Sequence, residues 1–331
     1  MKKDTKVVVL GGGSWATAIV KMLCEKVDQV GWYMRNTAAI EYIKEHNHNP
    51  NYLTSVEFKT SQLLLSDDIN ELVEYAEIII FAIPSAFLNT ELSKLTVSLK
   101  DKMVFSAIKG IVPETGMIVG EHLNETYEIP FENIGVIAGP CHAEEVALER
   151  LSYLTIACQD EEKAKCLADC LTSDYIFCKT SDDIIGTEYA AMLKNIYAIA
   201  AGIAHGLGYG DNYQAVLMSN AIREMKRYIK KVHKMKRNIN NSAYLGDLLV
   251  TGYSTFSRNR MFGNMIGKGY TVKSAMMEMK MVAEGYYAVK SAYEINQVNG
   301  AKTPIIDTVY SVIYEGKSPR KHFKILSENL D

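Results

Sequence analysis

A four-residue apolar run at residues 7–10 ends directly in the glycine-rich segment GGGSWA at residues 11–16. The segment fits the pattern G-x-G-x-x-G/A between a strand and a helix, which is the context in which this pattern indicates a dinucleotide site. Gly11 permits a tight turn, Gly13 lets the backbone approach a pyrophosphate, and the small Ala16 lets the helix pack close to the strand. Any sharp strand-to-helix turn can use glycine, but the flanking segments favour the nucleotide interpretation.

Short apolar runs alternate with amphipathic stretches through the first half of the chain. This alternation is typical of βαβ units and predicts a mainly parallel sheet covered by helices. The continuous Val and Ile content of the runs suits strands that are buried on both faces. We expect strands at residues 6–10, 29–34, 77–83, 103–108, 134–138 and 153–158, and helices at residues 15–26 and 67–75.

From about Thr187 the strand-like runs disappear, and helical periodicity continues to the C-terminus. We therefore expect a Rossmann-like, doubly wound α/β domain at residues 1–186, followed by an all-α substrate and catalytic domain at residues 187–331. Each of the clearest helices is bounded by Gly, Asn, Asp or Pro. They are expected at residues 187–206, 212–232, 281–297 and 304–314.

Length and charge exclude several classes of protein. A chain of 331 residues exceeds the size of most single cores, which agrees with two domains. The net charge of −3 and the absence of a basic stripe argue against nucleic acid as a partner and favour a small molecule. No stretch approaches the ~18 apolar residues of a membrane span, so we expect no membrane insertion. The tyrosine-rich and methionine-rich C-terminal helices suit either a homodimer face or an ordinary helical core.

The six cysteines lack the paired loop spacing of a disulfide framework and indicate reduced thiols in a cytoplasmic protein. Cys166 and Cys170 share a helix face, but no second Cys or His pair lies nearby to complete a zinc site. We interpret them as structural thiols and expect no metal. The segment at residues 46–50, HNHNP, is interpreted as a polar turn.

Lys194 is the only charged residue between Glu188 and His205, in a segment that is apolar almost all round. A helix of that kind is expected to be central and buried. Burial of an ammonium group is costly unless the group is paired or its pKa falls, and a lysine with a lowered pKa can act as a general base. The alternative is a lysine that reaches the surface, with Asn195 as a hydrogen-bonding neighbour.

A second polar cluster combines Asp247 with the segment Ser257-Arg258-Asn259. Serine at the start of a helix satisfies backbone N–H groups, the helix N-terminus attracts anions, and arginine donates a forked pair of hydrogen bonds to phosphate. This pattern predicts a phosphate site, although an ordinary capped helix with surface arginines has the same residues.

Two further segments follow expected strands at the edge where open α/β sheets bind ligands. Lys109 follows the strand at residues 103–108, and the segment GPCHA at residues 139–143 follows the next strand. Without that position, Lys109 would be an ordinary surface lysine.

The second expected strand ends without the carboxylate that usually binds the ribose hydroxyls of NAD. It ends instead in Arg35 and Asn36. Arg35 is suited to the 2′-phosphate of NADP, or to stacking on adenine, which would serve both cofactors. We expect NADP(H) to be used at least as well as NAD(H).

Several longer stretches together resemble the NAD(P)-dependent glycerol-3-phosphate dehydrogenase family over nearly the whole chain. The combination of LKN, GDN, GDL and SRN in this order is more specific than the glycine turn. The stretches are GGGSWATAIV, FAIPS, SAIKG, AGPCHAEEVA, EYAAMLKNIYAIAAGIAHGLGYGDN, GDLLVTGYSTFSRNRMFG and VAEG.

The resemblance implies an oxidoreductase that interconverts dihydroxyacetone phosphate and sn-glycerol 3-phosphate with NAD(P)H for phospholipid synthesis. It implies that Lys194 accepts the proton from the C2 hydroxyl and that Asp247 supports this lysine. The implied substrate-binding positions are Lys109, Gly139, Cys141, Lys194, Asn195, Asp247, Ser257, Arg258 and Asn259. The implied cofactor-binding positions are Gly11, Gly13, Ser14, Trp15, Arg35, Lys109, Ala143, Arg258, Val282 and Glu284.

Cys141 departs from the family pattern, in which Ser or Thr is common at this position. A thiol is a weak hydrogen-bond donor. Substrate affinity is then lower, or a neighbouring backbone group fills the role.

Two other functions fit parts of the sequence. One is another dehydrogenase with a Rossmann domain and a helical domain, acting on a hydroxy acid or hydroxyacyl thioester; the Ser257-Arg258-Asn259 segment argues against it. The other is a nonenzymatic NAD(P)-sensing protein, which would bind nucleotide without reducing dihydroxyacetone phosphate.

The Arg35→Ala variant tests the expected use of NADP. Loss of a charge-assisted hydrogen bond to the 2′-phosphate should raise the KM for NADPH about tenfold or more. Steady-state assays at varied NADPH measure this value, and an unchanged KM would show that Arg35 does not bind the phosphate.

Overall fold

The computed structural model describes residues 5–279 and 283–331. The chain divides into two compact units. The first unit contains residues up to 108 and residues 117–184, and the second contains residues 109–116 and 185–331. The segment at residues 109–116 therefore belongs to the helical unit, although in sequence it lies among the strands.

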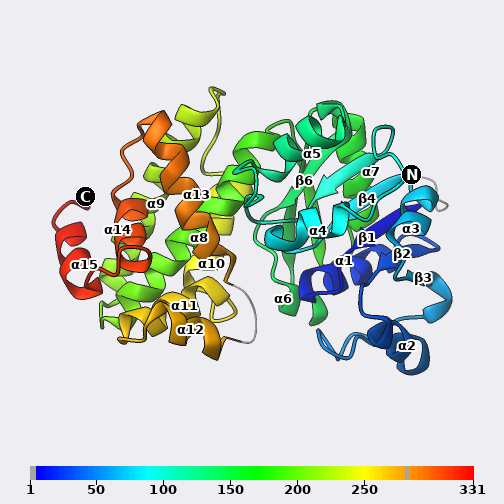
Figure 1. Ribbon diagram of the computed structural model, residues 1–331, viewed down its shortest axis with the longest axis horizontal. Helices are drawn as coiled ribbons and strands as arrows, with labels where there is room; N and C mark the ends of the chain where they lie inside the picture. The colour runs from blue at the N-terminus through cyan, green and yellow to red at the C-terminus, as the bar shows by residue number, and fades with distance from the viewer. Residues whose placement is uncertain (1–4, 280–282) are drawn as a thin grey trace. The chain divides into compact units, whose positions relative to one another are not determined.

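The first unit is built on an eight-stranded sheet with the strand order β3-β2-β1-β4-β5-β6-β7-β8 (Figure 1). All neighbouring strands pair in parallel except β6 and β7, which are antiparallel. The chain leaves β1 for β2 on one side and returns to β4 on the other, as in doubly wound dinucleotide-binding sheets. The strands are β1 (Val7–Leu10), β2 (Val30–Tyr33), β3 (Leu63–Ser66), β4 (Ile78–Phe81), β5 (Met103–Ser106), β6 (Ile134–Ala138), β7 (Ser152–Cys158) and β8 (Ile176–Ser181).

The fold class expected from the sequence is confirmed, and each of the six expected strands is present. The strands β3 and β8 were not expected. Both lie at edges of the sheet, and their side chains are largely half-buried or exposed. They therefore lack the continuous apolar run that marks a strand buried on both faces.

Helices cover the sheet, and their apolar faces form the main core of the first unit with the central strands. The helix α1 contacts β1 and β2 and also packs against α6 and α7. It has no acidic residue in its first turn. The helices are α1 (Ser14–Cys24), α2 (Thr37–His46), α3 (Ile69–Tyr75), α4 (Leu88–Leu92), α5 (Val119–Tyr127), α6 (Ala143–Ala147) and α7 (Glu161–Leu171).

The second unit is helical and is organised around α8 (Ile184–Gly206) (Figure 1). Every residue of this helix from 186 to 204 is buried. This confirms the expectation of a central helix. None of the described helices is long and apolar enough to cross a membrane. The other helices are α9 (Asp211–Val232), α10 (Asp247–Tyr253), α11 (Arg258–Gly267), α12 (Val272–Glu278), α13 (Glu284–Asn299), α14 (Pro304–Ile313) and α15 (Pro319–Ser327).

Candidate active site

The glycine turn between β1 and α1 has the backbone geometry that its sequence predicts. Gly11 has φ +136°, a conformation that side chains rarely allow, and a Cβ atom there would lie 2.4 Å from the carbonyl oxygen of Ala82. Position 11 therefore requires glycine. At Gly13, which precedes the first residue of α1, no atom lies within 4 Å of where a Cβ would stand.

Two side chains donate hydrogen bonds to the backbone carbonyl groups of the turn. Trp32 donates its indole N–H to the carbonyl oxygen of Gly11 at 2.7 Å, and Asn49 donates to the carbonyl oxygen of Gly12 at 3.2 Å. Asn49 is fully buried and also donates to the hydroxyl of Thr17 at 3.0 Å. These hydrogen bonds restrain the carbonyl groups of Gly11 and Gly12.

The sequence did not reveal the contact that Asn49 makes with the glycine turn. The segment at residues 46–50 was interpreted as a polar turn, and Asn49 does accept hydrogen bonds from the backbone N–H groups of Asn51 and Tyr52, as an asparagine in a turn does. Its side-chain amide N–H, however, donates a hydrogen bond to the glycine turn. The only sequence signal was Asn-Pro, which indicates a turn and carries no information about a contact 37 residues away.

The turn fits the pyrophosphate of a dinucleotide. The N-terminus of α1 carries a partial positive charge, its first turn has no carboxylate, and the position above Gly13 is open. Ser14 and Trp15 are the first two residues of this helix. An anion with closely spaced oxygens is the ligand that these features favour.

Arg35 lies just beyond β2, where an NAD-specific site usually has a carboxylate. Its side chain is 64% exposed, its guanidinium lies over the ring of Phe87, and it is 3.9 Å from the carboxylate of Glu91. Burial acts to raise the pKa of Glu91, but hydrogen bonds from Lys94 and Tyr33 and the charge of Arg35 lower it. This carboxylate therefore already has Lys94 as its close partner at 2.8 Å, which leaves Arg35 accessible to a ligand.

Gly139, Cys141 and Ala143 follow β6 in the first unit. Gly139 has φ +118°, and a Cβ there would lie 2.7 Å from the carbonyl oxygen of Tyr153, so glycine is required for the chain to pass β7. Cys141 is 3% exposed and packs in the main core of this unit. Ala143 is the first residue of α6.

Lys194 lies on α8, and its ammonium group is paired with the carboxylate of Asp247. Both residues are buried, with 3% and 1% of their surfaces exposed, which excludes a lysine that reaches the surface. Asp247 is the first residue of α10 and follows a π-helical turn, Ser242–Gly246, a distortion often found at functional sites. Its second carboxylate oxygen is buried and has no hydrogen-bond partner in the described part of the chain.

Burial lowers the pKa of Lys194, the charge of Asp247 opposes this, and the charge of Lys109 adds to the lowering, so that the net pKa is about 8. The amine is therefore poised to gain or lose a proton near neutral pH. Lys109 is held in place by Asn195, whose amide donates to the carbonyl oxygen of Lys109 at 3.0 Å. The structure thus gives Asn195 a contact with Lys109 that the sequence did not indicate.

The segment Ser257-Arg258-Asn259 forms the start of α11. Ser257 caps the helix by accepting a hydrogen bond from the backbone N–H of Arg260 at 3.3 Å, which confirms the expected cap. Asn259 is 8% exposed and accepts a hydrogen bond from the backbone N–H of Gly285 at 2.9 Å. Arg258 remains half-buried at the first position of the helix.

Glu284 is the first residue of α13, and its carboxylate interacts electrostatically with the positive groups of the site. Burial raises the pKa of Glu284, whereas the positive charges of Lys109, Arg258 and Lys194 lower it. Within the second unit the structure therefore brings together Lys109, Lys194 and Arg258 around Glu284. Val282, the remaining expected cofactor residue, lies outside the described residues.

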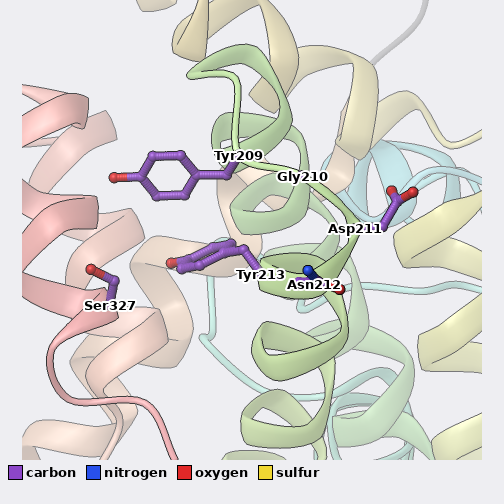
Figure 2. Close-up of a pocket in the computed structure, with 6 residues that line it drawn as sticks. All are labelled: Tyr209, Gly210, Asp211, Asn212, Tyr213 and Ser327. Carbon is purple, nitrogen blue, oxygen red and sulfur yellow. The ribbon is translucent and has the colours of Figure 1, made fainter.

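A separate hollow of about 410 Å³ in the second unit contains none of the expected site residues. Figure 2 shows the hydroxyl groups of Tyr209 and Tyr213 directed toward Ser327 on α15, whereas the carboxylate of Asp211 points away from them. The residues Gly210-Asp211-Asn212, which form the GDN stretch, line this hollow at the start of α9. Among the described residues, no group of three or more His, Cys, Asp or Glu side chains is arranged to hold a metal ion.

The doubly wound sheet, its nucleotide turn and a buried lysine with a lowered pKa indicate a nicotinamide-dependent dehydrogenase. Two family models match the chain: residues 6–164 match the N-terminus of NAD-dependent glycerol-3-phosphate dehydrogenase, and residues 183–324 match its C-terminus. The chain belongs to the NAD-dependent glycerol-3-phosphate dehydrogenase family.

Individual relatives agree with the family models. The chain is 35% identical over 313 residues to a glycerol-3-phosphate dehydrogenase [NAD(P)+] of Macrococcus caseolyticus, covering 94% of each protein. It is 33% identical to the enzyme of the same name from Staphylococcus epidermidis, covering 98% of each. A crystal structure of glycerol-3-phosphate dehydrogenase from Coxiella burnetii superimposes with a TM-score of 0.90 at 26% identity, covering 99% of this chain and 100% of that one.

The Asp247→Asn variant tests the electrostatic coupling in the site. Because the carboxylate raises the pKa of Lys194, its removal should lower that pKa below about 8. In the direction of alcohol oxidation, which needs the neutral amine, the pH at which kcat/KM reaches half its plateau should move down. The pH dependence of kcat/KM measures this shift.

Asp211→Asn is the matched control, since Asp211 is an exposed carboxylate that also begins a helix. The control should keep the wild-type profile. An Asp247→Asn profile with an unchanged or raised inflection would contradict the assignment. The phosphate of the substrate titrates near pH 6, well separated from this inflection.

Proposed function

We propose that the protein interconverts dihydroxyacetone phosphate and sn-glycerol 3-phosphate with NAD(P)H. The observation that carries this proposal is the buried Lys194, which is paired with Asp247. The charges of Lys194 and Arg258 both lower the pKa of the same carboxylate, Glu284. With the hydride supplied by the nucleotide, reduction of a phosphorylated ketone needs a proton donor and a phosphate-binding group from the protein. Family membership supports the same reaction.

The nucleotide turn of the first unit binds the cofactor in this proposal. When bound, NAD(P)H supplies the hydride that reduces the C2 carbonyl. The backbone N–H groups at the start of α1 receive the pyrophosphate, and Gly13 lets it approach closely. Trp32 and Asn49 keep the turn in its binding conformation, so little ordering is needed on binding.

The start of α11 binds the phosphate of the substrate in this proposal. Arg258 donates to the phosphate oxygens, and the helix N-terminus adds a favourable partial charge. Ser257 and Asn259 hold this turn through the hydrogen bonds described above. Binding of the phosphate at a fixed distance from C2 positions the carbonyl for reaction.

Lys194 is the acid in the reduction and the base in the reverse reaction. In its ammonium form it donates a proton to the oxygen at C2 as charge develops there; in its neutral form it accepts the proton of the C2 hydroxyl. The lowered pKa makes both forms accessible near neutral pH. Asp247 holds the ammonium group in place, and its second oxygen is available to a substrate hydroxyl.

We further propose that NADP(H) is used at least as well as NAD(H), supported by the exposed Arg35 and the lack of a carboxylate at the end of β2. The cellular role proposed is the supply of glycerol 3-phosphate for phospholipid synthesis in the cytoplasm. Formation of a homodimer through the C-terminal helices stays a prediction.

The Lys194→Ala variant tests the proton-transfer role. Loss of a general acid should lower kcat for dihydroxyacetone phosphate by about 10²–10⁴-fold, while the dissociation constant for NADPH stays near the wild-type value. Oxidation of NADPH followed at 340 nm and a fluorescence titration provide the two measurements.

Lys226→Ala, an exposed lysine on α9, is the matched control and should keep wild-type activity. Loss of NADPH binding in Lys194→Ala would instead mean that the lysine is structural. Wild-type protein that binds NADPH but does not oxidise it with dihydroxyacetone phosphate would support a nucleotide sensor, and activity only with hydroxy acids would support another dehydrogenase.

A further inference from the structure

The backbones of the helices α8 and α11 are in direct contact at glycine residues, and both helices contribute such glycines. A Cβ atom on Gly263 would lie 2.1 Å from the carbonyl oxygen of Ile199, and one on Gly267 would lie 2.3 Å from that of Ile203. The contacts are reciprocal, because a Cβ on Gly202 or Gly206 of α8 would lie 2.1 Å or 2.4 Å from a carbonyl oxygen of α11. Real Cβ atoms do not approach this closely, and a backbone atom cannot move aside as the end of a side chain can.

These contacts fix the register of the two helices. Ile199 lies opposite Gly263, and four residues later Ile203 lies opposite Gly267, so the helices run in the same direction and advance together by about one turn. One turn earlier, the same register reaches Asn195 on α8 and Asn259 on α11.

Gly285, near the start of α13, contacts both asparagines and so confirms that they lie side by side. A Cβ on Gly285 would lie 2.8 Å from both the carbonyl oxygen of Asn195 and the side-chain oxygen of Asn259, so one residue touches both at once. Lys194 and Arg258 immediately precede these two asparagines. The proton-transfer residue and the phosphate-binding residue therefore lie at the same level of the helix pair.

We infer that Gly202, Gly206, Gly263 and Gly267 are positioning residues for the reaction, because their backbone contacts set the spacing between Lys194 and Arg258. This inference rests on the roles proposed for those two residues. A slip of one turn would displace Arg258 by about 5.4 Å along the helix, and a wider crossing would move it sideways. Either change separates the phosphate-binding group from the proton donor.

Glycine is unfavourable within a helix compared with alanine, so helix stability alone does not explain these four residues. Close helix packing in general would explain them as a purely structural feature. The two explanations differ in what an added methyl group should do. A structural role predicts an equal loss of activity for every substrate, whereas a positioning role predicts a loss only where phosphate and carbonyl must be held together.

The test compares dihydroxyacetone phosphate with dihydroxyacetone, which has the same carbonyl but no phosphate. In the Gly263→Ala variant, kcat/KM for dihydroxyacetone phosphate should fall about 10²-fold, as expected for a displacement of roughly 1 Å. The value for dihydroxyacetone at high concentration should change less than threefold, and the NADPH dissociation constant should stay within twofold of wild type. The preference for the phosphorylated substrate should therefore collapse.

Gly267→Ala provides a milder version at the last residue of α11, where the helix end can adjust, and should reduce the preference by a smaller factor. Gly210→Ala is the matched control, because no atom lies within 4 Å of its would-be Cβ and its φ of −82° accommodates alanine. The control should keep the wild-type preference.

An unchanged ratio of the two kcat/KM values in folded Gly263→Ala or Gly267→Ala protein would overturn the inference, even if both activities fall. That outcome would leave the proposed function intact, because the wild type would still prefer the phosphorylated substrate. A wild type without activity on dihydroxyacetone phosphate would overturn the proposed function and this inference with it.

Discussion

The ion pair between Lys194 and Asp247 is the interaction on which the rest of the site depends. An ammonium group on a helix buried from residue 186 to residue 204 loses its hydration, and this loss amounts to several kcal/mol for each ion. The carboxylate offsets only part of it, since the pKa of Lys194 still falls to about 8. The same desolvation that makes the pair unfavourable for stability therefore gives the enzyme an amine that exchanges a proton near neutral pH.

Such a pair works only if the surrounding backbone is fixed. Glycine contacts join α8 and α11, Asn259 accepts the backbone N–H of Gly285 at the start of α13, and Asn195 holds the carbonyl of Lys109. The nucleotide turn of the first unit follows the same physical rule, because Trp32 and Asn49 engage its carbonyls. In both units, polar side chains buried behind the site orient the groups that meet the ligand.

The sequence predicts what depends on local pattern. Buried strands such as β1 and β4 are continuous apolar runs, and α8 is apolar almost all round, so their type and burial follow from composition. The edge strands β3 and β8 were missed because most of their side chains are half-buried or exposed. The burial of Lys194 was predicted as one of two alternatives, since an apolar stretch with one charge between Glu188 and His205 is compatible with both.

What the sequence could not predict are contacts between distant segments. Asn49 reaches the glycine turn 37 residues earlier, a contact with no local signal. The pairing of Asp247 with Lys194, 53 residues away, was implied only by the family resemblance and not by any local pattern. The grouping of residues 109–116 with the helical unit has no local signal, because the preceding strand belongs to the sheet. The glycine register of α8 and α11 is visible only when the two backbones are placed together, since a glycine within a helix has many possible reasons.

The most direct test of this account is an NMR titration of the ammonium group of Lys194 in the resting protein. Lysine-labelled wild type is compared with Lys194→Ala to assign the resonance, and its chemical shift is followed with pH. A titration near pH 8 is the predicted result. A titration at the ordinary value of 10.5 would show that burial does not tune this lysine and would contradict the account.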